Sequence, residues 1–262
     1  MTIGMRSGPP PERWECQDAP GDAVTLDWQY HIADQIMDAQ KGHSQKKLIS
    51  RNVANGKQKI ADPHADVSIY NFHYASPPDT VGMNYGLNKV IGDNETGFKG
   101  TNDLPYRIEA WEFIVAGGGL FNHLDYSFVP GHEDGSFAYP AKQPGGGGRG
   151  FRQQMRILRD FINGFEFVKM KPDNTVIQGR VPKGTWRGAL AETGRAYAIY
   201  LRNGADNGVL EVALPAGGYR AEWVSPLSGK VVKTEDFEHA GGTRSLVTPE
   251  PVGEIALKIT RR

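Results

Sequence analysis

One stretch of the chain places a carboxylate at the end of an expected strand, where it could take part in chemistry. Residues 88–98 read NKVIGDNETGF, a short apolar run followed by a burst of polar residues and a glycine turn. A (β/α) barrel presents reacting groups in this way, at the carboxyl ends of its strands. Glu95 is therefore the candidate catalytic residue, because a carboxylate on a rigid strand end can act as a nucleophile or carry a proton. The same pattern also fits a buried strand followed by a solvated turn acid.

Five further side chains at the ends of expected strands are candidates for substrate binding. The amides of Asn52 and Asn55 could both donate to and accept from hydroxyl groups, although asparagines are also ordinary turn formers. His73 could bond a nucleophilic carboxylate or a substrate hydroxyl, or it could be a satisfied histidine at the rim. Asp125 and Tyr126 lie towards the end of the last expected strand of this region, and for both a ligand contact and a structural pairing are equally open.

The spacing of apolar residues predicts the elements that position these groups. Runs rich in β-branched and aromatic residues predict strands, and apolar residues at four-residue spacing predict helices. Their alternation favours parallel strands with crossover helices, an α/β fold. The expected strands are 47–53, 66–74, the run that leads to Glu95, and 120–128; the expected helices are 25–40, 79–87, 105–116 and 150–163.

Shorter features complete the prediction for this region. Residues 1–24 are expected to be irregular, and residues 25–166 to form the (β/α) part of the chain. Trp111 falls on the apolar stripe of its helix and is assigned to the core rather than to a stacking platform. The glycine run 145–148 lacks the setting of a phosphate-binding loop and is interpreted as a flexible linker.

From residue 167 onward the hydrophobic period changes to two. Tyr197, Ile199 and Leu201 alternate with smaller residues, and similar runs recur up to the end of the chain. Turn signals such as Asn203-Gly204 separate the runs at short intervals. This pattern predicts that residues 167–262 form an antiparallel β-sandwich.

The composition excludes several classes of function. The chain has 262 residues, and its 30 basic residues balance its 30 acidic residues, which argues against a nucleic-acid or membrane-surface partner. The single cysteine, Cys16, cannot form an internal disulfide. No stretch fits a signal peptide or a membrane span, so the sequence leaves the localisation undetermined. The clusters at 62–66 and 132–134 lack a second partner at metal-binding spacing, and no metal or other cofactor is predicted.

The region before residue 167 contains fewer (β/α) units than a complete barrel. A (β/α) barrel of eight strands needs roughly 200 to 250 residues. Only four units precede residue 167, and they correspond to strands five to eight of such a barrel. A half-barrel has two open strand edges and an exposed apolar face, so we expect self-association through these edges, rearrangement or aggregation.

Five short motifs stand out along the chain: KLISRN (47–52), VIGDNETG (90–97), AGGG (116–119), LDYSF (124–128) and FVKMKP (167–172). Through these motifs the chain resembles the C-terminal portion of bacterial clan-A-type glycoside hydrolases of the apiosidase-like group, whose barrel is followed by a domain labelled collagen-binding. The resemblance implies hydrolysis of glycosidic bonds in polysaccharides by double displacement, a carbohydrate partner, and Glu95 as the nucleophile.

The acid/base residue that the resemblance implies is missing from its motif. The family carries it as the glutamate of an Asn-Glu-Pro motif, and the best counterpart here, residues 14–20, has Ala19 in that place. A retaining glycosidase needs two carboxyl groups about 5 to 5.5 Å apart, and Glu15 or Asp18 would have to supply the second. We therefore expect weak or no activity. The sequence also leaves open a non-catalytic carbohydrate- or protein-binding module that works through the β-sandwich, and a chain whose true start lies upstream.

Overall fold

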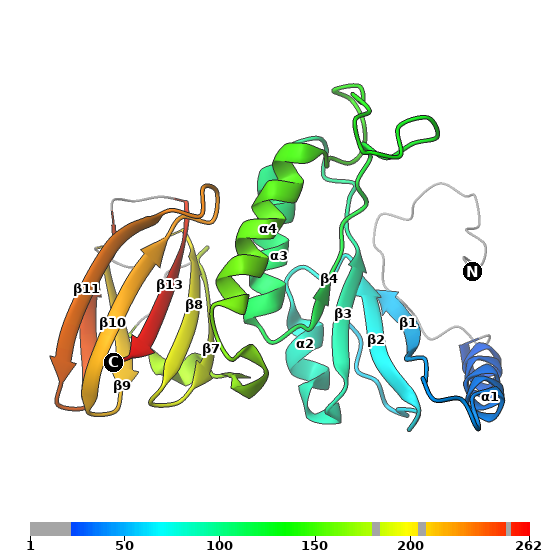
Figure 1. Ribbon diagram of the computed structural model, residues 1–262, viewed down its shortest axis with the longest axis horizontal. Coiled ribbons are helices and arrows are strands. Elements are labelled where there is room, and N and C mark those ends of the chain that lie inside the picture. The colour runs from blue at the N-terminus through cyan, green and yellow to red at the C-terminus, as the bar shows by residue number, and fades with distance from the viewer. Residues whose placement is uncertain (1–21, 180–183, 204–207, 250–252) are drawn as a thin grey trace. The chain divides into compact units, whose positions relative to one another are not determined.

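The computed structural model describes residues 22–179, 184–203, 208–249 and 253–262 (Figure 1). The chain divides into two units, Met1–Lys47 and Leu48–Arg262. In the first unit, helix α1 spans Asp22–Ala39, where the sequence predicts a helix over 25–40. None of the described helices has the length and apolar character needed to cross a membrane.

The N-terminal acids considered above cannot be placed. Glu15, Asp18 and Ala19, together with Cys16, lie outside the described residues. The candidate active site is therefore built from the second unit alone.

The second unit begins with a four-stranded parallel sheet in the order β1-β2-β3-β4. Helices follow β2, β3 and β4, as the hydrophobic periods predict, whereas β1 leads to β2 without a helix between them; this part of the chain is α/β. The strands are β1 (Ile49–Asn55), β2 (Val67–His73), β3 (Val90–Glu95) and β4 (Leu120–Phe121), and the helices are α2 (Asp79–Asn84), the short 3-10 helix η1 (Tyr85–Leu87), α3 (Asp103–Val115) and α4 (Arg149–Asn163).

The two faces of the parallel sheet differ in character. Tyr70 and Phe72 of β2 and Ile91 of β3 pack with Val81 of α2 and Phe113 of α3 in one apolar core. Since successive side chains of a strand point to opposite faces, the residues between them face away from this core. We call the face that carries Tyr70, Phe72 and Ile91 the core face of the sheet, and the opposite face the polar face.

The predicted strand over 120–128 is wrong, because β4 ends at Phe121. The backbone still follows β3 for a few residues, since the N–H groups of Asn122 and Leu124 donate to the carbonyl oxygens of Asp93 and Thr96, each at 2.8 Å. At Asp125 the chain turns, because the carboxylate of Asp125 accepts a local hydrogen bond from the N–H of Ser127 at 3.0 Å. Aspartate often starts a turn through such a bond.

Two antiparallel sheets follow α4, with the strand orders β11-β10-β13-β8-β7-β5 and β12-β9-β6. Buried side chains from both sheets form one apolar core between them. The elements are η2 (Phe167–Lys169), β5 (Lys171–Pro172), η3 (Asn174–Val176), β6 (Ile177–Gln178), β7 (Trp186–Glu192), β8 (Ala196–Arg202), β9 (Val209–Leu214), β10 (Gly217–Val224), β11 (Val231–His239), β12 (Gly242–Val247) and β13 (Glu254–Arg261).

Strand β8 is buried on both faces, which its alternating pattern did not predict. Ile199 belongs to the core between the two antiparallel sheets. Ala198 and Tyr200 belong to a second core, shared with α3 and α4. Trp111 of α3 is fully buried there and stacks on Tyr200 with ring centroids 5.4 Å apart, which confirms its assignment to the core. Helix α3 therefore contacts both the parallel sheet and the six-stranded sheet.

Candidate active site

A bulge at the end of β3 determines which way Glu95 points. Along the β2–β3 pair, Phe72 lies opposite Asp93, whereas the next residue, His73, lies opposite Glu95, so Asn94 is an extra residue on β3. Without it, Glu95 would share the core face with Asp93, two residues earlier. The bulge moves Glu95 to the polar face, beside His73, and bulges re-aim side chains in this way next to active sites.

Two neighbours on β2 and the turn after it hold the carboxylate of Glu95. The hydroxyl of Tyr74 donates a hydrogen bond to Oε1 of Glu95. Nδ1 of His73 lies 3.6 Å from Oε2, and both side chains are 22% exposed. Burial, followed by the hydrogen bond to Glu95, raises the pKa of the Tyr74 phenol well above its ordinary value, so the phenol remains a donor. One carboxylate oxygen is thus fixed, while the other faces His73.

The sequence predicts that Asn52, Asn55 and His73 lie near Glu95, and the strand register brings them together. Asn55 is exposed and lies opposite His73 at the end of β1. Nδ2 of Asn94, the bulge residue, donates to Oδ1 of Asn52 at 3.3 Å. Nδ2 of Asn122 donates to the carbonyl oxygen of Asn94 at 3.1 Å. These amides line the strand ends beside Glu95. Asn94 is the bulge residue of β3 and Asn122 directly follows β4, and the sequence predicts neither as a site residue.

A row of aromatic rings continues from Tyr74 to Tyr126. The rings of Tyr74 and Phe98 meet edge to face with centroids 5.9 Å apart, and those of Phe98 and Tyr126 with centroids 6.3 Å apart. Phe98 is 55% exposed and adopts a left-handed φ of 58°. Burial, followed by the charge of Glu95, raises the pKa of Tyr126. Aromatic rings beside a few polar groups are typical of ligand sites. Phe98 carried no signal in the sequence beyond its place after Gly97.

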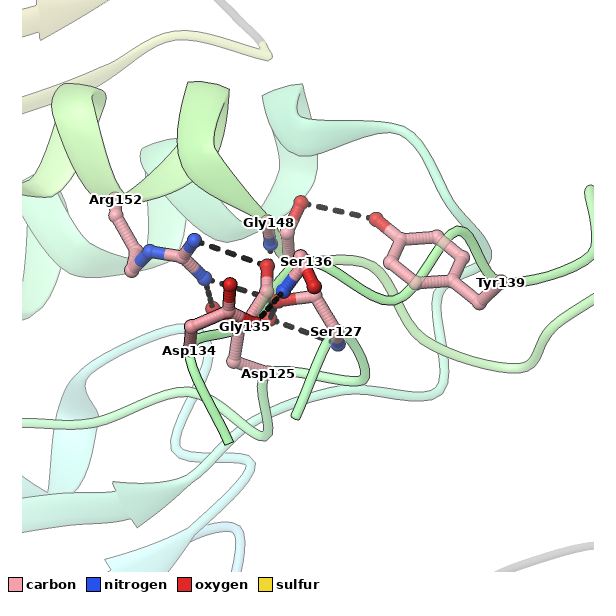
Figure 2. Close-up of polar contacts among 9 residues, drawn as sticks. Asp125, Ser127, Asp134, Gly135, Ser136, Tyr139, Gly148 and Arg152 are labelled. Carbon is pink, nitrogen blue, oxygen red and sulfur yellow. Dashed lines mark hydrogen bonds and ion pairs between the residues drawn. The ribbon is translucent and has the colours of Figure 1, made fainter. Parts of the chain in front are cut away.

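Asp125 is engaged within the protein through both carboxylate oxygens (Figure 2). Oδ1 accepts from the hydroxyl of Ser127 at 2.6 Å and from the N–H of Gly148 at 2.8 Å. Oδ2 accepts from Nη1 of Arg152, on α4, at 2.7 Å. Burial alone would raise the pKa of Asp125, but the hydrogen bonds from Ser127, Gly148 and Arg152 outweigh it and hold the pKa below its ordinary value. The carboxylate therefore joins the loop before α4 to the helix.

The glycine run 145–148 is packed, so its interpretation as a flexible linker is wrong. A side chain at Gly145 would collide with the ring of Tyr126, and one at Gly147 would collide with Asp125. The carbonyl oxygen of Gly147 accepts from the hydroxyl of Tyr139 at 2.9 Å. The glycines are needed here for close approach rather than for freedom. Because these residues are glycines, the loop can pack directly against the ring of Tyr126.

A cavity of about 460 Å³ lies between β4 and α4, away from Glu95. Neither Glu95 nor its partners His73 and Tyr74 line this cavity. Its wall is mostly apolar, with some polar side chains such as Asn122, Arg152 and Asn163. The apolar residues of this wall include Leu120, Phe121, Phe151, Met155, Leu158 and Ile162. The cavity adjoins the open edge of the parallel sheet and is separate from the carboxylate site.

Comparison with solved structures finds glycoside hydrolases. One, described as a glycoside hydrolase, superimposes with a TM-score of 0.63 at 16% identity, covering 93% of this chain and 63% of that chain. A glycoside hydrolase family 5 protein from Bacteroides vulgatus ATCC 8482 gives a TM-score of 0.64 at 16% identity, covering 93% of this chain and 61% of that one. The chain thus spans only part of the length of these structures. No protein-family model and no curated protein matches its sequence. The likeness lies in the fold, and the chain has a glycoside-hydrolase-like fold.

Proposed function

We propose that this protein is glycoside hydrolase-like and that Glu95 is the nucleophile of a retaining mechanism. The observation that carries the proposal is the bulge at Asn94, which turns Glu95 out of the core face and against Tyr74 and His73. A carboxylate held at a strand end, with one oxygen fixed by a donor and partly exposed to solvent, suits attack on an anomeric carbon. The fold-level likeness to glycoside hydrolases supports the same reading.

Each group around Glu95 has a role in this proposal. Oε2 attacks the anomeric carbon, the bond to the leaving oxygen breaks, and a glycosyl ester forms on Glu95. Tyr74 fixes Oε1 and orients the carboxylate. Asn52 and Asn55 offer amide groups to the hydroxyls of a carbohydrate, which is the proposed partner, and His73 offers a ring nitrogen. Tyr126 borders the site through its ring. Asp125 contributes indirectly: it binds the loop 145–148, which packs against the ring of Tyr126.

The architecture proposed with this function is that of the apiosidase-like group. Residues 25–166 then correspond to part of a (β/α) barrel, strands five to eight, and residues 167–262 to the β-sandwich domain labelled collagen-binding. The four parallel strands and the two antiparallel sheets support this assignment. Ala19 stands where the family motif has its acid/base glutamate, so a second carboxyl group would have to come from Glu15 or Asp18. Glycosyl transfer to Glu95 is therefore expected to proceed only with leaving groups that need no protonation, and release of the sugar by water is expected to fail.

This half-reaction makes a clear kinetic prediction. With 2,4-dinitrophenyl β-glucoside, β-xyloside or β-galactoside, we expect one of the sugars to give a single burst of dinitrophenolate, close to one equivalent per protein, without sustained hydrolysis. Glu95→Gln should abolish the burst, and Glu133→Gln, a substitution in an exposed turn, should leave it intact. Sustained hydrolysis of these glycosides that is lost in Glu95→Gln would contradict the expectation of weak or no activity. A burst that persists in Glu95→Gln would contradict the assignment of Glu95 as the nucleophile.

We also propose that the open edges of the parallel sheet pair with a second copy of the chain. Strand β4 is an edge of the sheet in the part of the chain that the structure describes, and the apolar cavity beside it would be covered by such a contact. Light scattering after size-exclusion chromatography should report a dimer. Charged substitution of both Phe121 and Met155 should favour the monomer. A wild-type chain that stays monomeric at high micromolar concentration would disprove the pairing.

A further inference from the structure

We propose that Asp93 is a positioning residue for the site, acting on Glu95 through the turn that carries Tyr74. The expected effect of Asp93 on the reaction rests on the proposed function, whereas its contacts with the turn do not. Asp93 lies two residues before Glu95 and, because the bulge falls between them, on the opposite face of the sheet.

The carboxylate of Asp93 is buried beneath the strand ends. Its side chain is only 1% exposed, and Oδ2 accepts a hydrogen bond from the backbone N–H of Ala75 at 3.0 Å. Ala75 is the residue directly after Tyr74, in the turn between β2 and α2. Among the described residues, Oδ1 has no hydrogen-bond partner. The hydrogen bond to Ala75 therefore ties this buried carboxylate to the turn that carries Tyr74.

The turn needs such support because Tyr74 has a strained backbone. Its φ is 55°, in the left-handed region that a tyrosine rarely adopts. Strain of this kind persists only where the surrounding contacts over-determine it. The N–H of Tyr74 donates to the carbonyl oxygen of Glu95 at 2.9 Å, and the N–H of Ala75 donates to Asp93. Two successive amides of the turn are thus bound to β3, and this places the Tyr74 hydroxyl on Oε1 of Glu95.

A carboxylate is costly to bury, so its presence at residue 93 calls for a specific partner. Burial raises the pKa of Asp93 to about 7, against the backbone amides of Ala75, Glu95 and Tyr74, and the charge of Glu109 on α3 raises it further. Glu109 is itself paired with Lys99. An acceptor oxygen at residue 93 is what the Ala75 amide requires, and an aspartate supplies it at the correct length.

The test compares Asp93→Ala with Asp93→Asn, which keeps an acceptor oxygen for Ala75. The first readout is the ¹³Cζ resonance of Tyr74, assigned with Tyr74→Phe, because this carbon senses the hydrogen bond to Glu95. We expect Asp93→Ala to move the resonance towards its position in Glu95→Gln, and Asp93→Asn to leave it near the wild-type position. The second readout is the rate at which Glu95 gives its burst with the reactive glycoside, which should fall at least about tenfold in Asp93→Ala, since small misplacements of a reacting group are costly.

Each outcome decides the inference. An unchanged Tyr74 resonance in Asp93→Ala would overturn it, and so would equal shifts in Asp93→Ala and Asp93→Asn. If Asp93→Ala does not fold, Asp93→Ser takes its place, because its shorter side chain falls short of the Ala75 amide. A wild-type chain without any burst would count against the proposed function alone, since the Tyr74 resonance would still decide the role of Asp93.

Discussion

Glu254→Ala is expected to lower the free energy of unfolding by roughly 3 to 5 kcal/mol, the cost of breaking a buried ion pair. Glu254 of β13 and Arg107 of α3 are 7% and 6% exposed. Nε of Arg107 donates to Oε1 of Glu254 at 2.6 Å, and the hydroxyl of Tyr200 donates to Oε2 at 2.6 Å. Removing the carboxylate leaves a buried guanidinium without its counterion, while Gln154 remains a neutral partner at 2.5 Å.

The measurement is urea unfolding at pH 7, compared as the change in midpoint at constant slope. Asp236→Ala is the matched control, because Asp236 pairs with Arg220 on the exposed face of β10 and β11 and should contribute little. The double substitution Glu254→Leu with Arg107→Leu should recover much of the loss, since it removes both charges. A loss in Glu254→Ala no larger than that of the control would show that the contact between α3 and β13 contributes little to stability.

Asp93→Asn is expected to raise stability at pH 8 and to flatten its dependence on pH. Folding raises the pKa of Asp93 from its ordinary 3.8 to about 7, chiefly through burial. The folded state therefore holds the proton more tightly than the unfolded state. Stability from this group is fully present below the unfolded pKa of 3.8 and is lost as the pH rises through the folded pKa near 7. At about 1.4 kcal/mol per pKa unit, the loss amounts to roughly 4 kcal/mol at most.

The difference between wild type and Asp93→Asn isolates this group from its neighbours. Glu109 on α3 faces Asp93, and burial raises the pKa of Glu109 as well, against its pair with Lys99. Glu109 remains in both proteins, so its contribution largely cancels in the comparison. Urea unfolding between pH 4.5 and 8.5 should show a falling stability in wild type and a shallower fall in Asp93→Asn. Parallel curves for the two proteins would mean that Asp93 is not protonated on folding. Asp79→Asn, in an exposed position, serves as the control substitution.

The sequence predicts the order of elements well, because long apolar periods determine it. Apart from the strand predicted over 120–128, the strands and helices from residue 25 to residue 163 lie where the periods indicate, and Trp111 is in the core. The strand predicted over 120–128 is too long, because Asp125 finds a local partner in Ser127 that ends the extended backbone. The sequence does not show that the glycine run 145–148 is packed, because glycine is typical both of flexible segments and of close backbone approach. Only the folded structure brings the Tyr126 ring against Gly145.

The candidate site could be predicted only in part. Glu95 is found from its place at a strand end, yet period-two alternation from Ile91 would put it on the core face with Asp93. The extra residue on β3, Asn94, moves Glu95 to the polar face, and no local sequence pattern predicts this bulge. Tyr74 ends the strand predicted over 66–74, and the sequence does not predict its left-handed backbone, because that conformation depends on contacts with β3, which lies much later in the chain. Tertiary contacts, rather than propensity, build the surroundings of Glu95.

The most direct test of the account is the site of covalent labelling by an activated fluoroglycoside. A 2,4-dinitrophenyl 2-deoxy-2-fluoroglycoside loses its leaving group without a proton donor, and the fluorine slows release of the sugar, so the ester on the nucleophile survives digestion. Trypsin yields the peptide 90–99, which contains both Asp93 and Glu95. Fragmentation of this peptide should place one sugar on Glu95, and the label should be absent from Glu95→Gln. A sugar on Asp93 or on any other peptide, or no label with the glucosyl, xylosyl and galactosyl probes, would contradict the assignment of Glu95 as the nucleophile.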